Sequence, residues 1–246
     1  PESRPLGLVH AKVLSISPQG QMAILLDPSR RPGYFQRGTL AVVPLTGGTP
    51  RELLEKVMSA AWTPDGRDLC VSRIHPDGEV TIELPPGTVL HRTREYASPI
   101  RVSWDGRYIA YADGGVGKVM LIDRERRAAR ALADIGANLW GLAWAPVGLE
   151  VWFTEGSSPG ARDVYAVDLE GRRRLVYRSA GRLGLVDTAP DGRVLFHRSL
   201  DRMGAMALLP GSPVERDVTV YDDSSIGALS SDGRLLLLNS TSEAAG

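Results

Sequence analysis

The sequence predicts an all-β protein, a β-propeller made of four-stranded blades. Three observations lead to this fold class: a repeated strand-turn-strand pattern, a repeat period slightly above forty residues, and a third strand between successive copies. Four copies share an Asp-Gly-Arg turn and read WTPDGRDLCV (62–71), VSWDGRYIAY (102–111), TAPDGRVLFH (188–197) and LSSDGRLLLL (229–238). Two degenerate copies read ISPQGQMAIL (16–25) and WAPVGLEVWF (144–153), in which Gln19 and Val147 replace the aspartate.

Each copy centres on a turn glycine. Asp-Gly between apolar runs is the strongest short signal of a β-hairpin, because glycine accepts a positive φ without steric cost. The structural turn residues assigned on this basis are Gly20, Asp65, Gly66, Asp105, Gly106, Gly148, Asp191, Gly192, Asp232 and Gly233. Successive glycines are 40 to 46 residues apart, a period that fits a propeller blade or a helical HEAT-type unit.

The residues around the turn decide between these two architectures. Positions four before and four after the glycine are mostly apolar, which predicts strands packed on both faces. The two columns are Ile16, Trp62, Val102, Trp144, Thr188, Leu229 and Ile24, Cys70, Ala110, Trp152, Phe196, Leu237. Each interval also holds a third strand such as EVTIEL (79–84), in which apolar and polar residues alternate, followed by a fourth, outer strand. Four strands per repeat are typical of a propeller blade.

Two segments carry local helix signals. TPRELLEKV (49–57) has the pattern of a helix N-terminal capping box, and DRERRAARALAD (123–134) is rich in helix-forming residues. Both segments fall where other repeats place a turn and an outer strand. Since a missing outer strand would leave the edge of a blade open, we predict strands at both positions.

The chain is expected to form one propeller domain over residues 1–246. Its predicted blades lie near 11–56, 57–96, 97–138, 139–183, 184–223 and 224–246, and the last is incomplete. Either PLGLVH (5–10) supplies a closing strand or more blades exist beyond this chain. The pattern favours a fragment of a larger propeller.

Composition argues against several classes of partner. The 29 basic and 29 acidic residues cancel, so charge gives no reason to expect nucleic acid as a partner. No run approaches the roughly 18 apolar residues of a membrane span, which argues against direct membrane insertion. The charged runs 124–127 and 172–174 are interpreted as solvated turns, with an anion site as the alternative. Because Cys70 is the single cysteine, the chain cannot form an internal disulfide, and one cysteine does not indicate the redox compartment. Cys70 lies in an apolar strand pattern and is predicted to be a buried small hydrophobic residue.

The sequence predicts no catalytic residue, no metal site and no cofactor. GSSPG (156–160) matches the nucleophile elbow of α/β-hydrolases, but Pro159 lacks the N–H that the oxyanion hole needs after Ser158. DGGVG (113–117) precedes a strand and not a helix, so it lacks the helix N-terminus of a phosphate site. The four histidines show no metal-ligand spacing: His10, His75, His91 and His197.

The blade pattern is similar to the TolB-type, WD-like (PD40-type) propeller repeat of bacteria, over nearly the whole chain. Stretches such as GTLAVVPLTGGTPRELLEKVMSAAWTPDGRDLCV (38–71) and GLAWAPVGLEVWFT (141–154) resemble the propeller module that follows the kinase domain in acidobacterial-type serine/threonine kinases. The resemblance implies a non-catalytic sensor or protein-interaction module of a larger bacterial signalling protein, with an extracytoplasmic location favoured over a cytoplasmic one. No Gly-rich phosphate loop and no HRD or DFG motif is present, so kinase activity is not expected of these residues.

Three alternatives stay open at this point. The chain could be the propeller of a prolyl-oligopeptidase-type peptidase, which would need an α/β-hydrolase domain beside it. A TolB-like periplasmic scaffold is the second alternative. A propeller enzyme such as a metal-dependent lactonase is the third, and it demands several inward-facing ligands from different blades.

A binding surface is predicted on the rim opposite the Asp-Gly turns. The side chains expected to converge on the channel mouth are Asn138, Trp140, Arg182, Asp222 and Asp223, with Tyr34 and Phe35 as exposed aromatic anchors further out. The expected partner is a protein or peptide, or a small ligand at the channel mouth. In the alternative interpretation, Trp140 packs between blades and Asp222 caps a turn.

Overall fold

The computed structural model contains only β-strands and connecting segments in the residues it describes. Those residues are 5–30, 36–114, 117–136, 138–156, 161–179, 181–199, 205–208, 211, 213–219 and 224–240. Over these ranges there are 21 strands and no helix, and all pairings are antiparallel. The predicted all-β class is confirmed.

The first seven strands form one sheet in the order of the chain. They are β1 (Ala11–Ile16), β2 (Gln21–Arg30), β3 (Gln36–Pro44), β4 (Arg51–Trp62), β5 (Leu69–Ile74), β6 (Val80–Glu83) and β7 (Val89–Thr93). Strand β4 has two partners, because its first half pairs with β3 and its second half, from Val57 onward, pairs with β5. Lys56, with φ of 60°, bends the strand between the two halves. The sheet therefore consists of two four-stranded units that share β4.

Two further four-stranded sheets and one hairpin follow. The second sheet contains β8 (Ala97–Val102), β9 (Tyr108–Asp113), β10 (Lys118–Asp123) and β11 (Ala128–Asp134). The third sheet contains β12 (Asn138–Trp144), β13 (Glu150–Gly156), β14 (Asp163–Asp168) and β15 (Arg173–Tyr177), and a hairpin of β16 (Arg182–Thr188) and β17 (Val194–Ser199) comes next. We divide β1–β17 into units 1 to 5: β1 to the first half of β4, the second half of β4 to β7, β8–β11, β12–β15 and β16–β17.

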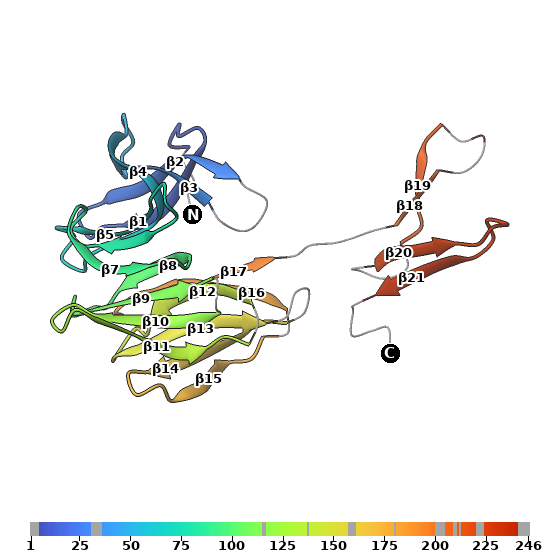
Figure 1. The fold of residues 1–246 in the computed structure, drawn as a ribbon. Helices are drawn as coiled ribbons and strands as arrows, with labels where there is room; N and C mark the ends of the chain where they lie inside the picture. Colours follow the sequence, from blue (N-terminus) through green and yellow to red (C-terminus); the bar gives the residue numbers. More distant parts are fainter. Residues whose placement is uncertain are drawn as a thin grey trace.

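The last four strands form two separate hairpins. They are β18 (Met206–Leu208), β19 (Glu215–Asp217), β20 (Ser224–Leu229) and β21 (Leu236–Ser240), and Figure 1 shows them apart from the body made by β1–β17. No sheet closes a ring, so blade number and propeller closure remain predictions. Residues 5–10 form no strand, which removes PLGLVH as a closing strand; Leu6 and Leu8 instead pack against the apolar face of β2 and β3.

The first strands of successive units lie side by side in the order β1, β4, β8, β12, β16 (Figure 1). Hydrogen bonds link neighbouring units along this series. The amide of Ile100 on β8 donates to Ser59 Oγ on β4 at 3.2 Å, and Thr188 Oγ1 on β16 donates to the carbonyl oxygen of Trp144 on β12 at 2.6 Å. Each unit is therefore joined to the next by polar contacts as well as by packing.

The core lies between the faces of neighbouring units. Alternate residues of a strand point to opposite faces, so β9 sends Tyr111 and Ile109 toward unit 2 and Ala110 toward unit 4. Cys70 is fully buried in the cluster between units 2 and 3, as predicted. Units covered on both sides need apolar residues at successive positions, which explains the nearly continuous apolar runs.

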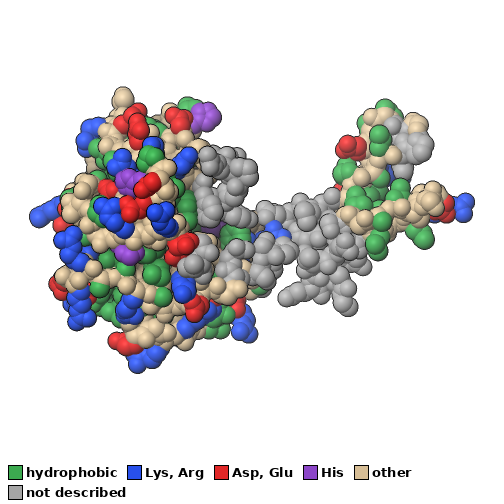
Figure 2. Space-filling model, viewed as in Figure 1, with side chains coloured by type: hydrophobic (Ala, Val, Ile, Leu, Met, Phe, Trp, Pro, Cys, Tyr) green, Lys and Arg blue, Asp and Glu red, His purple; other side chains and the backbone are tan. Residues whose placement is uncertain are grey.

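The predicted apolar columns are not buried throughout. In the sixth copy Leu229 and Leu237 are 64% and 60% exposed, because the described residues place no neighbouring sheet against β20 and β21. Figure 2 shows hydrophobic side chains over the surface of these last hairpins. The prediction of packing on both faces is therefore wrong for this copy, and it is also wrong at Ile16 in the first copy, which is 52% exposed.

All six repeat glycines lie in turns that connect two paired strands, and each has a positive φ. In the copy at 62–71 the loop Thr63–Asp68 separates the strands, and the amide of Gly66 donates to the Thr63 carbonyl oxygen at 2.8 Å. Thr63 Oγ1 donates to Asp65 Oδ1 at 2.6 Å, and the amide of Arg67 donates to the same oxygen at 3.1 Å. The hydroxyl bond first, and then the amide bond, lowers the pKa of Asp65.

Both segments with helix signals are strands. Residues 51–57 belong to β4, and β11 spans Ala128–Asp134, with 124–127 forming the turn before it. Pairing of these segments to β3 and β10 outweighs local preferences worth tenths of a kcal/mol per residue. The strand prediction is confirmed at both sites.

Candidate functional site

Arg101 on β8 interacts electrostatically with Lys12 on β1 and with Asp187 on β16. Arg101 on β8 donates from Nη2 to the carbonyl oxygen of Val186 on β16 at 3.1 Å. Burial lowers the pKa of Arg101 and the charge of Asp187 opposes that shift, while burial and then the charge of Arg101 lower the pKa of Lys12 on β1. Sequence analysis missed this cluster, because its members lie in three different repeats and share no motif.

The predicted rim holds Trp140 at the start of β12 and Arg182 at the start of the neighbouring strand β16. The guanidinium carbon of Arg162 lies 3.5 Å from the centroid of the Trp140 ring, and Arg162 is only 4% exposed. This geometry is a buried cation–π contact. Trp140 thus has a packing partner within its own unit; packing of Trp140 between blades and ligand binding at this rim both remain predictions.

The other predicted rim residues cannot be placed on the site. Asn138 begins β12, but its side chain is outside the described part of the structure. Four further candidates also lie outside the described residues: Tyr34, Phe35, Asp222 and Asp223. Of the seven predicted binding residues, the structure describes the side chains of Trp140 and Arg182, which lie on the neighbouring strands β12 and β16.

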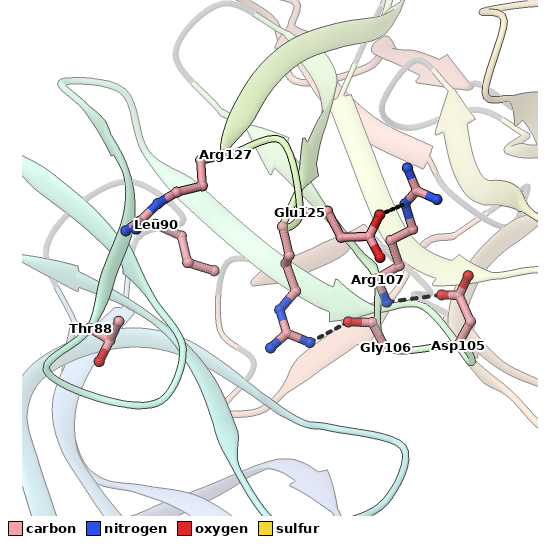
Figure 3. Close-up of a pocket in the computed structure, with 8 residues that line it drawn as sticks. Thr88, Leu90, Asp105, Gly106, Arg107, Glu125 and Arg127 are labelled. Atoms are coloured by element: carbon pink, nitrogen blue, oxygen red, sulfur yellow. Dashed lines mark hydrogen bonds and ion pairs between the residues drawn. The ribbon is translucent and has the colours of Figure 1, made fainter.

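A cleft of about 440 Å³ opens on the opposite rim, where the Asp-Gly turns lie (Figure 3). It lies between the β6–β7 hairpin of unit 2 and two turns of unit 3, β8–β9 and β10–β11. We call it the arginine cleft, and its lining residues are Thr88, Leu90, Asp105, Gly106, Arg107, Arg124, Glu125 and Arg127. Sequence analysis weighed an anion site at 124–127 only as the alternative to a solvated turn.

Arg107 is neutralised within the protein. Its Nη2 lies 3.1 Å from Asp123 Oδ2 and its Nε lies 3.3 Å from Glu125 Oε2. The hydrogen bond to Asp123 raises the pKa of Arg107. Burial alone would raise the pKa of Asp123, but the bond from Arg107 and the backbone amides of Glu125 and Arg126 outweigh it and lower that pKa. Arg107 is thus a structural ion-pair partner in the wall of the cleft.

Arg124 and Arg127 bind backbone carbonyl oxygens instead of carboxylates. Arg124 Nη1 donates to the Gly106 carbonyl oxygen, and Arg127 Nη2 donates to the Val89 carbonyl oxygen at 3.2 Å. No carboxylate of the described residues lies within ion-pair distance of either group. A guanidinium has five N–H donors, so both side chains keep positive charge and free donors for an anion.

A second, smaller cleft of about 290 Å³ lies on the other side of the β10–β11 hairpin, between units 3 and 4. Arg126 and Arg130 line it from that hairpin, and Leu169 and Glu170 line it from unit 4. Arg130 Nη2 donates to the carbonyl oxygen of Leu169. The hairpin thus presents basic side chains to the clefts on both of its sides.

One buried chain of polar groups superficially resembles a catalytic relay. His75 Nε2 lies 2.9 Å from Thr81 Oγ1, and Thr81 donates to Glu83 Oε1 at 2.6 Å. A nucleophilic triad needs histidine between the hydroxyl and the carboxylate. Here the hydroxyl is in the middle and is 1% exposed, so the chain ties together the β5–β6–β7 region and has no access to substrate.

Other catalytic features find no support in the described ranges. No three His, Cys, Asp or Glu side chains of those ranges gather as metal ligands. Ser158 of the GSSPG motif lies outside them. The described part of the chain also contains no helix with the length and apolarity needed to cross a membrane.

Comparison of sequences alone finds nothing similar: neither a protein-family model nor a curated protein matches this chain. Comparison of folds, in contrast, finds similar solved structures. TolB from Acinetobacter baumannii superimposes with a TM-score of 0.58 at 17% identity, over 88% of this chain and 57% of that protein. A putative TolB from Agrobacterium tumefaciens gives a TM-score of 0.56 at 19% identity, over 75% of this chain and 72% of that one. The chain has a TolB-like β-propeller fold.

The similarity to TolB supports the predicted repeat type. At this level of identity it concerns the fold alone, and the chain spans little more than half of the first TolB protein. Neither TolB neighbour links the chain to a protein kinase. That expectation therefore rests on the resemblance of the quoted stretches.

Proposed function

We propose that this chain is a non-enzymatic β-propeller module that binds other proteins or peptides. The observation that carries the proposal is the TolB-like stack of sheets, whose rims offer clefts and charged side chains. Polar groups that resemble a relay are buried within one unit and serve its structure. The fold supplies surfaces, and binding is the activity that such surfaces support best.

The finer proposal places the module in a larger bacterial signalling protein, a serine/threonine kinase. Its support is the resemblance of residues 38–71 and 141–154 to kinase-associated propellers. The coding sequence on either side of this chain tests it. A kinase domain upstream supports the proposal, whereas a parent gene with an α/β-hydrolase domain would favour the peptidase alternative.

A TolB-like scaffold is the second candidate function, and the fold similarity favours it over the peptidase. We propose an extracytoplasmic location for either candidate. A fusion of the native coding region to alkaline phosphatase, which is active only after export, measures this directly. Activity in the fusion agrees with the proposal, and an inactive fusion of normal abundance contradicts it.

Site-specific photocrosslinking in the source organism tests partner binding. A photoreactive amino acid replaces Trp140 or Arg182 on the predicted rim, or Arg127 on the arginine cleft, and a matched control replaces Leu175 on the outer strand β15. Binding at either rim gives discrete crosslinked species at one rim position and none at the control. If none of the rim positions gives such a species in cells that contain the folded protein, the interaction function is wrong.

A further inference from the structure

We propose that the arginine cleft binds an acidic peptide segment of a partner protein, with Arg124 and Arg127 as the ligands of its side-chain carboxylates. The proposal rests on the interaction function above and names the partner chemistry. Figure 3 shows that Arg127 and Leu90 lie on one side of the cleft and Arg107 on the other, with Glu125 between them. Charged side chains therefore lie on both sides of the cleft, and Leu90 adds an apolar contact beside Arg127.

The ion pairing of these two arginines differs from that of Arg173 and Arg174 on the outer strand β15. Arg173 pairs with Glu155 and Arg174 pairs with Glu150, so the charges on those edges are satisfied within the chain. Arg124 and Arg127 bind only carbonyl oxygens among the described residues. A carboxylate from a partner would supply the missing counter-charge and accept two parallel N–H bonds from a guanidinium.

The backbone at Arg127 is an independent observation. Arg127 has φ of 51°, a left-handed conformation that favours glycine. The corresponding hairpin of unit 4 places Gly171, with φ of 84°, in this region, and that of unit 2 places Gly87, with φ of 92°. An arginine in place of glycine keeps a strained residue in the turn, and strain of this kind is typical of binding sites.

The composition of the cleft favours a carboxylate-bearing peptide over a nucleic acid. Asp105 and Glu125 also line it and repel any uniform polyanion such as a phosphate backbone, whereas a peptide can place isolated carboxylates at Arg124 and Arg127 and neutral residues elsewhere. Leu90 and Thr88 offer an apolar and a hydroxyl contact to the rest of a peptide residue. A segment that crosses the β10–β11 hairpin also meets Arg126 and Arg130 in the second cleft.

Fluorescence anisotropy with a fluorescein-labelled peptide that carries two glutamates among neutral residues tests the proposal on the whole chain. We expect the double variant Arg124→Gln/Arg127→Gln to weaken binding by at least about tenfold, because charge-assisted hydrogen bonds are lost. The matched control is Arg67→Gln/Arg193→Gln, which removes the same charge from the same rim, where both arginines pair with their own turn aspartates. The control should change the affinity less than about twofold.

Three results would overturn the proposal. The first is that the peptide does not bind the unmodified protein. The second is an equal loss of peptide affinity in both double variants, which would indicate diffuse electrostatic attraction. Displacement of the peptide by inorganic phosphate, under conditions where acetate at the same ionic strength has no effect, would show that the site takes phosphate and not carboxylate.

The variant Arg127→Gly separates binding from folding. Glycine relieves the left-handed backbone, so we expect a melting temperature no lower than that of the unmodified protein together with weaker peptide binding. Weaker binding with an unchanged or higher melting temperature supports the proposal, and unchanged binding overturns it. Crosslinks at position 140 without peptide binding at the cleft would reject this inference and leave the interaction function standing.

Discussion

Arg101 on β8 reaches past β12 to the carbonyl oxygen of Val186 on β16, where its Nη2 donates a hydrogen bond of 3.1 Å. Its Nη1 donates to the carbonyl oxygen of Ile100 at 2.9 Å. The intervening strand carries Ala143 at the same distance from its turn glycine, so only a methyl group stands at that position. One side chain thus connects unit 3 to unit 5.

Arg101→Met is expected to lower the free energy of unfolding by roughly 2–3 kcal/mol, since two hydrogen bonds from a charged donor disappear. Urea denaturation monitored by tryptophan fluorescence measures the change. Arg67→Met is the matched control, because the Arg67 side chain is 84% exposed, and it should alter stability by less than about 0.5 kcal/mol. Equal effects of the two substitutions would argue against the contact between units.

Gly141→Ala tests the close approach of β12 and β16. A Cβ atom at Gly141 would lie 1.8 Å from the carbonyl oxygen of Leu185, so the two strands must separate to accommodate it. We expect a loss of about 3 kcal/mol, the upper part of the range for overpacking. At Gly181 the nearest atoms would be 3.9 Å away, and Gly181→Ala should be nearly neutral in the same thermal melt. Similar melting temperatures for the two variants contradict this packing.

The thiol of Cys70 should be inert in the folded protein. Burial raises its pKa from an ordinary value of 9.0 to about 12, so hardly any reactive thiolate forms at pH 8. Labelling with an aromatic disulfide reagent is expected only after denaturant is added. Because the unfolded thiol ionises at lower pH than the folded one, this group makes stability fall as pH rises above about 9. Rapid labelling of the native protein would show that Cys70 is accessible.

The turn aspartates predict how stability responds to acid. Side-chain hydroxyls, followed by backbone amides, lower the pKa of Asp65 and Asp232 below the ordinary 3.8. Their contribution to folding stability is therefore complete above about pH 4 and is lost as pH falls through the lowered pKa values. The melting temperature of Asp65→Asn/Asp232→Asn should fall less steeply between pH 5 and pH 2, as followed by circular dichroism. If melting temperature falls equally with pH in the variant and in the unmodified protein, these turns do not cause the acid sensitivity.

Most of the local structure follows from patterns within single repeats. Turn glycines and flanking apolar runs lie within about ten residues of each other, so short-range rules predict the hairpins. The strand at 51–57 required the repeat as a whole, because its local signals favour a helix and only the open edge of the blade argued for a strand. What the sequence does not reveal is which polar groups meet across units. Ser59 and Thr188 look like ordinary strand residues, and only the arrangement of the sheets makes them partners of Ile100 and Trp144.

The arginine cleft was harder to predict for the same reason. The arginine cleft combines Leu90 of unit 2 with Arg124 and Arg127 of unit 3, and no motif joins them. Net charge does not locate the cleft either, because the availability of an arginine depends on whether a carboxylate of the chain pairs with it. Arg172 pairs with Asp168 in the corresponding turn of unit 4, whereas Arg127 finds only a carbonyl oxygen.

Amide hydrogen exchange at Leu185 tests the stacking of units in sequence order most directly. The amide of Leu185 on β16 donates to Thr154 Oγ1 on β13 at 2.9 Å, and both groups are buried between units 4 and 5. We predict that this amide is protected in the unmodified protein and exchanges faster in Thr154→Val, while the amides of β1 and β2 keep their rates. An amide of Leu185 that exchanges at the same rate in both proteins would contradict the account.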